Sequence, residues 1–513
     1  MHSKKFWKSI FLMNKLVFCR YIWLFAALVF SSCYEVEDTT NYYFKALEGQ
    51  EDKLPTSISQ NARSFEFEVA FDTGQEWTAT IEGENTDWLK LSANEGSAGI
   101  NKIFLKAEEN NLGKAREAEL YIMAKTMGKR IKVIQRPHTQ RTVLLYMAAE
   151  NSLASFAMDD VMELVQGSAS IPNEDNMLVY IDDTKLPRIY QIDPEKRDTV
   201  RVKTFDTDLD SASPETVKLV LNYVYQNYNS EEGYGLVMWS HGEGFIPGTS
   251  SAVTRYIGID NGKNSPSANT GSSLDVRDLA TSITQSDIKH LQFLFFDACF
   301  MQTIEVIYQL KDCADYIVGS PCEIPGPGAP YSVMTKPFFS HPLDVKDISF
   351  EYYNYYDVNE VVASGSRYGA VLSAVDCSKV DAFTKLTRNL ITQYFNYGKE
   401  LPNIPNLIRY GFGSYGDGSR YSLYSDFGQV IKNVVGSDSP EYNQWKAAYD
   451  EMVISRDATS WWYTASHGTQ LLDRSNYTGV AACVPGICTE SVTLDSFRVT
   501  DWYTAAGWDA AGW

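Results

Sequence analysis

The stretch Leu291–Met301 (LQFLFFDACFM) constrains the fold of this chain more than any other. It starts with a nearly continuous apolar run, LQFLFF, that is short enough for one strand. Such a run is typical of a central strand in a parallel sheet, because a strand so rich in Phe and Leu must be covered on both faces. The run stops at Asp297-Ala298-Cys299, and residues 301–310 predict a helix. Polar residues at the carboxyl end of a buried strand occupy the edge where open α/β sheets place their ligand sites.

A second stretch has the same form. Residues 234–239 (YGLVMW) predict a buried strand, and Ser240-His241-Gly242 follows it directly. One strand therefore delivers a His and the other a Cys. An imidazole can take the proton of a thiol, which is a poor nucleophile until it is ionised. We expect His241 and Cys299 to form a catalytic dyad; the plainer alternative is a core imidazole and a buried thiol.

The backbone and side chains close to His241 and Cys299 have expected roles of their own. The backbone N–H groups of Gly242 and Cys299 are candidates for an oxyanion hole. A helix that starts near Met301 would place its amino end at Cys299 and favour the thiolate. Asp297 is not expected to activate Cys299, because a nearby carboxylate raises the pKa of a thiol. Asp297 either attracts a cationic substrate side chain, orients the backbone, or is plain scaffold.

Strands alternate with helices on both sides of this region. Residues 142–149 and 176–183 predict strands, and residues 152–166 and 214–228 predict helices. This alternation favours an α/β fold, with a mostly parallel sheet flanked by helices. No linker rich in Pro and Gly interrupts the chain after residue 141, so we assign 141–513 to one domain.

The amino-terminal residues predict export. A basic region precedes the apolar run at 21–30 (YIWLFAALVF), which is too short to span a bilayer, and Phe30-Ser31-Ser32-Cys33 follows. Residues 1–33 resemble a bacterial lipoprotein signal with Cys33 as the lipidated residue; a plain secretory peptide is the alternative. Residues 34–55 are polar and acidic, as expected of a tether at the outer membrane surface. The net charge of −20 argues against a nucleic-acid partner.

In residues 56–137, apolar and polar residues alternate with a period of two. Short alternating segments separated by Gly, Asn and Asp predict a small β-sandwich. The segments around Trp77 and Trp88, together with 133–136 (VIQR), resemble the BACON domain, an immunoglobulin-like sandwich. That resemblance implies a glycan contact. Trp77 and Trp88 either stack on a ligand or pack in the core.

Four segments of the following domain resemble the clostripain family. They are YMAAENSL at 146–153, MLVYID at 177–182, MWSHGEG at 238–244 and FFDACFMQTIEV at 295–306. The resemblance implies a caspase-like fold and a dyad in which His241 and Cys299 suffice. It also implies a protein or peptide substrate that is cut on the carboxyl side of a chosen P1 residue.

The resemblance leaves the P1 preference open. The best-known members select Arg or Lys with acidic residues, and they usually carry a Ser followed directly by an acidic pair. Here Ser320 is followed by Pro321-Cys322-Glu323, so one acid remains and is shifted. Asp297 and Glu323 are the candidate substrate-binding residues. We predict no metal site and no required cofactor; calcium enters only by family analogy, since the loop between the two motifs lacks DxDxDG spacing.

The sequence therefore predicts a cysteine endopeptidase displayed on the bacterial surface as a lipoprotein. One alternative is a surface lipoprotein that binds glycan or protein and carries an inactive peptidase-like domain. Another is a different Cys/His acyl-transfer enzyme.

Overall fold

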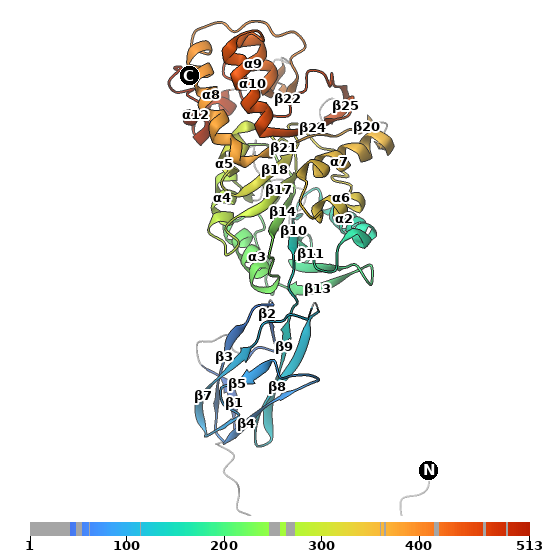
Figure 1. Cartoon of the computed structure of the whole chain (residues 1–513), viewed down its shortest axis with the longest axis vertical. Coiled ribbons are helices and arrows are strands. Elements are labelled where there is room, and N and C mark those ends of the chain that lie inside the picture. Colours follow the sequence, from blue (N-terminus) through green and yellow to red (C-terminus); the bar gives the residue numbers. More distant parts are fainter. Residues whose placement is uncertain are drawn as a thin grey trace, which may run out of the picture. The chain divides into compact units, whose positions relative to one another are not determined.

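Figure 1 shows the computed structural model of the chain, which describes residues 42–47, 54–60, 62–112, 114–245, 257–262, 272–359, 361–363, 366–414, 420–464, 468–488 and 491–513. The predicted signal with Cys33 and most of the predicted tether lie outside these residues. Among the helices of the described ranges, none is long and apolar enough to cross a bilayer.

Contacts divide the described residues into two compact units. The first comprises the residues up to Ile58 with Ser64–Glu108 and Glu117–Val133. The second comprises Ser59–Arg63, Glu109–Arg116 and Ile134–Trp513.

The amino-terminal region is all-β, as predicted. Its two sheets have the strand orders β1-β3-β7-β5 and β2-β9-β8-β4-β6. Trp77 and Trp88 are 4% and 5% exposed and belong to the hydrophobic core. Both rings therefore pack inside the protein and cannot stack on a ligand. The strands are β1 (Phe44–Ala46), β2 (Ser57–Gln60), β3 (Phe65–Thr73), β4 (Trp77–Glu82), β5 (Leu89–Leu91), β6 (Glu95–Gly96), β7 (Gly99–Ala107), β8 (Arg116–Ala124) and β9 (Met127–Gln135).

The second unit is built on a nine-stranded sheet with the order β13-β12-β11-β10-β14-β17-β18-β21-β24. The pairings from β11 through β10, β14 and β17 to β18 are parallel. The outer pairings are antiparallel. The α/β prediction is confirmed, with the parallel part confined to the centre. The strands are β10 (Arg141–Ala148), β11 (Asn176–Asp182), β12 (Arg188–Asp193), β13 (Asp198–Thr204), β14 (Gly233–Trp239), β17 (Leu291–Asp297), β18 (Ala314–Gly319), β21 (Val371–Asp376) and β24 (Val453–Ala458).

Helices cover both faces of this sheet, which explains the continuous apolar runs. In β10, Val143, Leu145 and Met147 enter one hydrophobic cluster, whereas Leu144 and Tyr146 enter another. Figure 1 shows α2, α6 and α7 on one side of the central strands and α3, α4 and α5 on the other. These helices are α2 (Ala154–Gly167), α3 (Pro214–Asn227), α4 (Val276–Thr284), α5 (Ile304–Leu310), α6 (Tyr331–Phe338) and α7 (Val345–Asn359).

The carboxyl-terminal elements extend the same core. Phe383, Phe427, Trp445 and Trp502 form a connected aromatic group within the cluster that also holds α3, α4 and α5. The region belongs to the unit of the nine-stranded sheet. Its helices are α8 (Val380–Tyr394), α9 (Phe427–Val435), α10 (Pro440–Met452), α11 (Ser491–Arg498) and α12 (Asp501–Ala505). The remaining short strands are β15 (Ile257–Asp260), β16 (Ser272–Leu274), β19 (Val362–Ala363), β20 (Ser366–Arg367), β22 (Arg409–Ser414), β23 (Arg420–Asp426), β25 (Trp461–Thr464), β26 (Gly468–Leu471) and β27 (Ala481–Ala482).

Candidate active site

The two central strands β14 and β17 bring the predicted dyad to one place. They pair in parallel, and Trp239 lies opposite Asp297 in the register. His241 and Cys299 each lie two residues beyond the paired residue of their own strand, and both line one pocket of about 390 Å³. The sheet register therefore positions both residues. The described lining residues are Leu153, Trp239, Ser240, His241, Gly242, Glu243, Ile259, Asp297, Cys299, Phe300, Glu323, Ile324, Pro325, Gly326, Gly328 and Tyr463.

Cys299 lies in a turn after β17, and its environment disfavours the thiolate. Burial raises the pKa of the Cys299 thiol to about 12, and the carboxylates of Glu323, Glu243 and Asp297 act in the same direction. The backbone N–H of Ile324 donates a hydrogen bond to Sγ at 3.4 Å and opposes this effect. The resting thiol is therefore protonated near neutral pH.

The expected help from a helix terminus is absent. The sequence pattern placed the helix start near Met301, but α5 begins at Ile304. This prediction was wrong because the chain first makes a turn in which Phe300 adopts a positive φ of 60°. A helix terminus acts only within its own first turn. The amino end of α5 therefore does not support the Cys299 thiolate.

His241 is a half-buried imidazole whose orientation is fixed by a hydroxyl. Burial lowers its pKa from the usual value, so the ring is neutral near pH 7. The Oγ of Ser152 lies 2.8 Å from Nε2 of His241. Ser152 follows Asn151, whose side chain donates hydrogen bonds to the carbonyl oxygens of Ala148 and Ile259. The contact therefore comes from a well-anchored loop after β10.

Sequence reasoning missed Ser152. The signal was present, because Ser152 follows a third buried strand, β10, that ends at the same edge as β14 and β17. Ser152 is thus a polar residue beyond the end of a buried central strand, as His241 and Cys299 are.

Gly242 lies where a side chain cannot fit. A Cβ atom at this position would come within 2.7 Å of the carbonyl oxygen of Cys299 and 2.9 Å of the Cβ of Ala298. Real Cβ atoms do not approach other atoms this closely. The backbones of the two predicted oxyanion-hole residues are therefore packed directly against each other.

Asp297 lies on the wall of the same pocket and is almost fully buried. Its carboxylate accepts hydrogen bonds from the N–H of Ala329 at 3.1 Å and from the hydroxyl of Tyr331 at 2.8 Å. Burial raises the pKa of Asp297 to about 6, and these two donors limit the rise. Asp297 is thus mostly ionised at neutral pH. Tyr331, which sequence reasoning also missed, helps to hold it.

Glu323 lines the pocket together with Asp297 and Glu243. The described lining residues include these three carboxylates and no Lys or Arg. A concave site with one sign of charge concentrates ligands of the opposite sign. The pocket therefore suits a cationic group.

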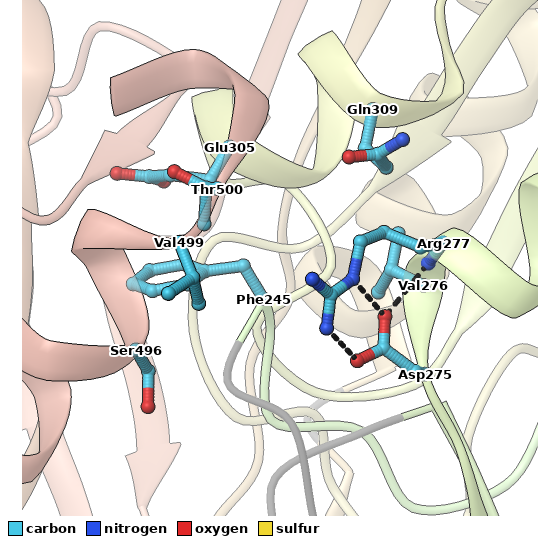
Figure 2. A pocket seen from close by; sticks show the side chains of 9 residues that line it. All are labelled: Phe245, Asp275, Val276, Arg277, Glu305, Gln309, Ser496, Val499 and Thr500. Carbon is cyan, nitrogen blue, oxygen red and sulfur yellow. Dashed lines mark hydrogen bonds and ion pairs between the residues drawn. The ribbon is translucent and has the colours of Figure 1, made fainter. Parts of the chain in front are cut away.

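A second pocket lies between α4, α5 and α11 and is shown in Figure 2. Arg277 and Asp275 form an ion pair on one wall, and Glu305 and Thr500 lie across from them. Its volume is about 20 Å³, enough for about one water molecule. This pocket cannot take a substrate.

Comparison with known sequences gives two matching families. The profile described as the Clostripain family matches residues 145–495, and the BACON profile matches residues 77–136. Clostripain of Hathewaya histolytica is 26% identical to this chain over 253 residues, which make up 44% of this chain and 45% of clostripain. The chain therefore spans less than half the length of that relative.

Two solved structures share the fold over nearly their whole length. One is a secreted C11 cysteine protease from Bacteroides thetaiotaomicron in complex with an irreversible peptide inhibitor. It has a TM-score of 0.61 and 29% identity, covering 72% of this chain and 99% of that one. The other is an inactive zymogen C11 protease from Parabacteroides distasonis, with a TM-score of 0.58, 25% identity and the same two coverages.

Proposed function

Because the chain belongs to the clostripain family of cysteine peptidases, we propose that it is an endopeptidase whose chemistry is performed by His241 and Cys299. The observation that carries this proposal is the position of both side chains in one pocket, each beyond the end of a neighbouring central strand. The fold alone would not suffice, since one fold supports many functions.

The mechanism starts from a neutral pair. His241 takes the proton of Cys299 as Sγ attacks the carbonyl carbon of the scissile peptide bond, so the charge develops only during the step. The N–H groups of Gly242 and Cys299 donate to the oxygen that becomes negative. The tetrahedral intermediate then collapses, the C–N bond breaks, and His241 returns its proton to the leaving amine. Water, deprotonated by His241, hydrolyses the thioester and restores the thiol.

Ser152 is a positioning residue in this scheme. Its hydroxyl occupies the Nε2 side of the imidazole, which leaves Nδ1 to exchange the proton with the thiol. The tautomer follows from the hydrogen-bond partner of the ring, as it does in other His-dependent sites.

The pocket charge points to peptides with Lys or Arg at P1. On a panel of fluorogenic peptides that differ only at P1, we expect kcat/KM for Arg to exceed that for Ala by at least about tenfold, or about 1.4 kcal/mol. Glu323→Gln should lower kcat/KM for the Arg peptide by about tenfold and change the Ala peptide little, because Glu323 lines the pocket and its charge is only partly screened.

A matched charge change controls for this effect. Glu84→Gln removes one carboxylate from an exposed position in the all-β region and should leave the whole profile unchanged. Cleavage of none of the peptides would contradict the endopeptidase proposal. An equal loss for Arg and Ala peptides in Glu323→Gln would remove Glu323 from P1 selection.

We further propose that the protein is a lipoprotein anchored through Cys33 and displayed on the outer membrane. The motif Phe30-Ser31-Ser32-Cys33 after a short apolar run supports this proposal. Cys33→Ser should move the protein from the membrane fraction to the soluble fraction. Unchanged partitioning would contradict the lipid anchor. Glycan contact by the BACON region stays a prediction, and any such contact must avoid the buried rings of Trp77 and Trp88.

A further inference from the structure

Trp239 lines the pocket that holds His241 and Cys299. It is the last residue of β14 and lies opposite Asp297 of β17 in the parallel register. Because successive side chains alternate between the two faces of a sheet, paired residues of neighbouring strands point to the same face. The ring of Trp239 packs in the cluster that also holds α2 and α6, so the ring and the Asp297 carboxylate both lie on the face that these helices cover (Figure 1).

The indole of Trp239 is tied to a buried acid of α2. Its Nε1–H donates a hydrogen bond to Oδ2 of Asp160 at 2.7 Å. Asp160 is 3% exposed and shares one face of the helix with Ala157, Val161 and Leu164, which pack in the same cluster as Trp239. An apolar residue would suit this face better, since burying a carboxyl group costs free energy unless the group is hydrogen-bonded. The bond to Trp239 therefore accounts for an acid at this position.

Asp160 holds the ring without adding charge to the pocket. Burial raises the pKa of Asp160 to about 9, the charge of Asp297 acts in the same direction, and the N–H of Trp239 opposes both. Asp160 is therefore protonated near pH 7, whereas Asp297, whose pKa burial raises only to about 6, is mostly ionised. The acid behind Trp239 thus acts as a neutral hydrogen-bond acceptor, and the negative charge stays on the pocket wall at Asp297.

Helix α2 also supports a second contact of Asp297. A Cβ atom on Gly167 of α2 would come within 2.5 Å of the carbonyl oxygen of Ser332 in α6, so the two helix backbones are in direct contact. Tyr331, the first residue of α6, donates the hydroxyl hydrogen bond to Asp297. Helix α2 therefore fixes Trp239 directly and supports Tyr331 through α6.

We propose that Asp160 is a positioning residue for P1 selection: by holding the indole of Trp239 in place, it keeps the space beside Asp297 open for the alkyl stem of a Lys or Arg side chain. This inference rests on the proposed peptidase function and deepens it. Long cationic side chains bury their stems along apolar surface while the charged head reaches a polar partner. Trp239 supplies the apolar surface, and Asp297 supplies the anion. A ring released from Asp160 can turn, so the P1 site loses its fixed shape while the strands still position the catalytic groups.

The test measures KM and kcat of the full chain for two peptides that carry Arg or Ala at P1. Asp160→Leu removes the acceptor and should raise KM for the Arg peptide by about tenfold, keep kcat within about threefold, and change the Ala peptide little. Asp160→Asn should stay within about threefold of the parent, because its amide, like the protonated acid, offers an acceptor and a donor. Trp239→Phe removes the donor and should reproduce the loss in Asp160→Leu. The double variant should lose no more than either single variant, since both remove the same bond.

Asp159→Leu is the matched control, because it makes the same change at the exposed neighbouring position of α2. It should keep the Arg preference of the parent. Thermal unfolding of each variant shows whether the protein is folded. If Asp160→Leu does not fold, Trp239→Phe and Asp160→Asn decide, and the first should lose the Arg preference while the second keeps it.

Three results would each overturn the role of Asp160. They are equal losses for the Arg and Ala peptides in Asp160→Leu, a lost Arg preference in Asp160→Asn, and additive losses in the double variant. Cleavage by the parent with an unchanged Arg preference in Asp160→Leu would overturn this inference alone, as would a parent that cuts both peptides equally well. No cleavage by the parent would overturn the proposed function as well.

Discussion

We expect Cys299→Ala and His241→Ala each to lower kcat for peptide cleavage by about 10⁴-fold or more, and the double variant to fall no further. The reason is that the resting thiol is protonated, so neither residue can act without the other. Single-turnover measurements with the P1 panel would give the rates. An approximately additive loss in the double variant would contradict a dyad that works as a unit.

Cys313→Ala is the matched thiol control. Cys313 is 1% exposed in the core, and its Sγ faces the carbonyl oxygen of Ala280 at 3.8 Å. It lines no part of the pocket that holds His241 and Cys299. Its substitution should alter stability but keep kcat within about twofold of the parent, as expected for a core thiol outside the site. Equal inactivation of both Cys variants would indicate a folding defect and not the loss of a nucleophile.

The pH dependence of kcat/KM in the parent protein provides an independent test of the proposed role of His241. His241 must be neutral to accept the proton, and burial lowers its pKa from the usual value of 6.5. Activity should therefore be full above pH 6.5 and fall only as the pH drops through the lowered pKa. The measurement is kcat/KM between about pH 4.5 and 8, which reports groups in the free enzyme. An acid limb centred above pH 6.5 would contradict this assignment.

Gly242→Ala should lower kcat by at least about 10²-fold, the loss typical of one oxyanion-hole donor. The new methyl group would meet the carbonyl oxygen of Cys299 at 2.7 Å, and backbone must move to relieve the contact. Such overpacking also costs about 1–3 kcal/mol of stability. Steady-state kinetics together with thermal unfolding would separate the two effects.

Gly326→Ala adds the same methyl group to the wall of the same pocket. Its nearest neighbour is the far end of the Phe156 ring at 3.3 Å, which can shift by a few tenths of an ångström. We expect a loss of less than about tenfold, since no backbone has to move. If Gly242→Ala were as active as Gly326→Ala, the close contact between Gly242 and Cys299 would have no catalytic role.

The placement of His241 and Cys299 in one pocket was predictable from the sequence, because two buried strands end just before these residues. A long apolar run predicts a buried strand, and neighbouring parallel strands end at the same edge of the sheet. The positions of His241 and Cys299 therefore follow from the strands and do not depend on the conformation of a long loop. The antiparallel outer strands were not predictable in this way. Their direction in the sheet depends on where the connecting segments reverse the chain. The sequence of a single strand does not indicate that direction.

Contacts made by loops escaped prediction. Tyr331 reaches Asp297 from the start of α6, and Ile324 reaches Cys299 from the segment after β18. Neither segment has a periodic pattern that sets its distance from the sheet. The start of α5 was misjudged for a related reason. The sequence MQTIEV is compatible with a helix from its first residue, whereas the chain first turns at Phe300 and α5 begins only at Ile304.

The parallel register that places Trp239 opposite Asp297 has a consequence for which parts of the pocket can change during evolution. The position of the proposed dyad depends on backbone hydrogen bonds in the middle of the sheet, where few substitutions are tolerated because both faces are packed. The pocket wall that we propose to contact the substrate comes instead from the connection after β18, where Glu323, Ile324 and Gly326 lie. Exchange of residues in that connection can redirect the choice of substrate while the bond-breaking groups stay in place. Proteins that share this scaffold can therefore differ in substrate specificity while they keep the same catalytic residues.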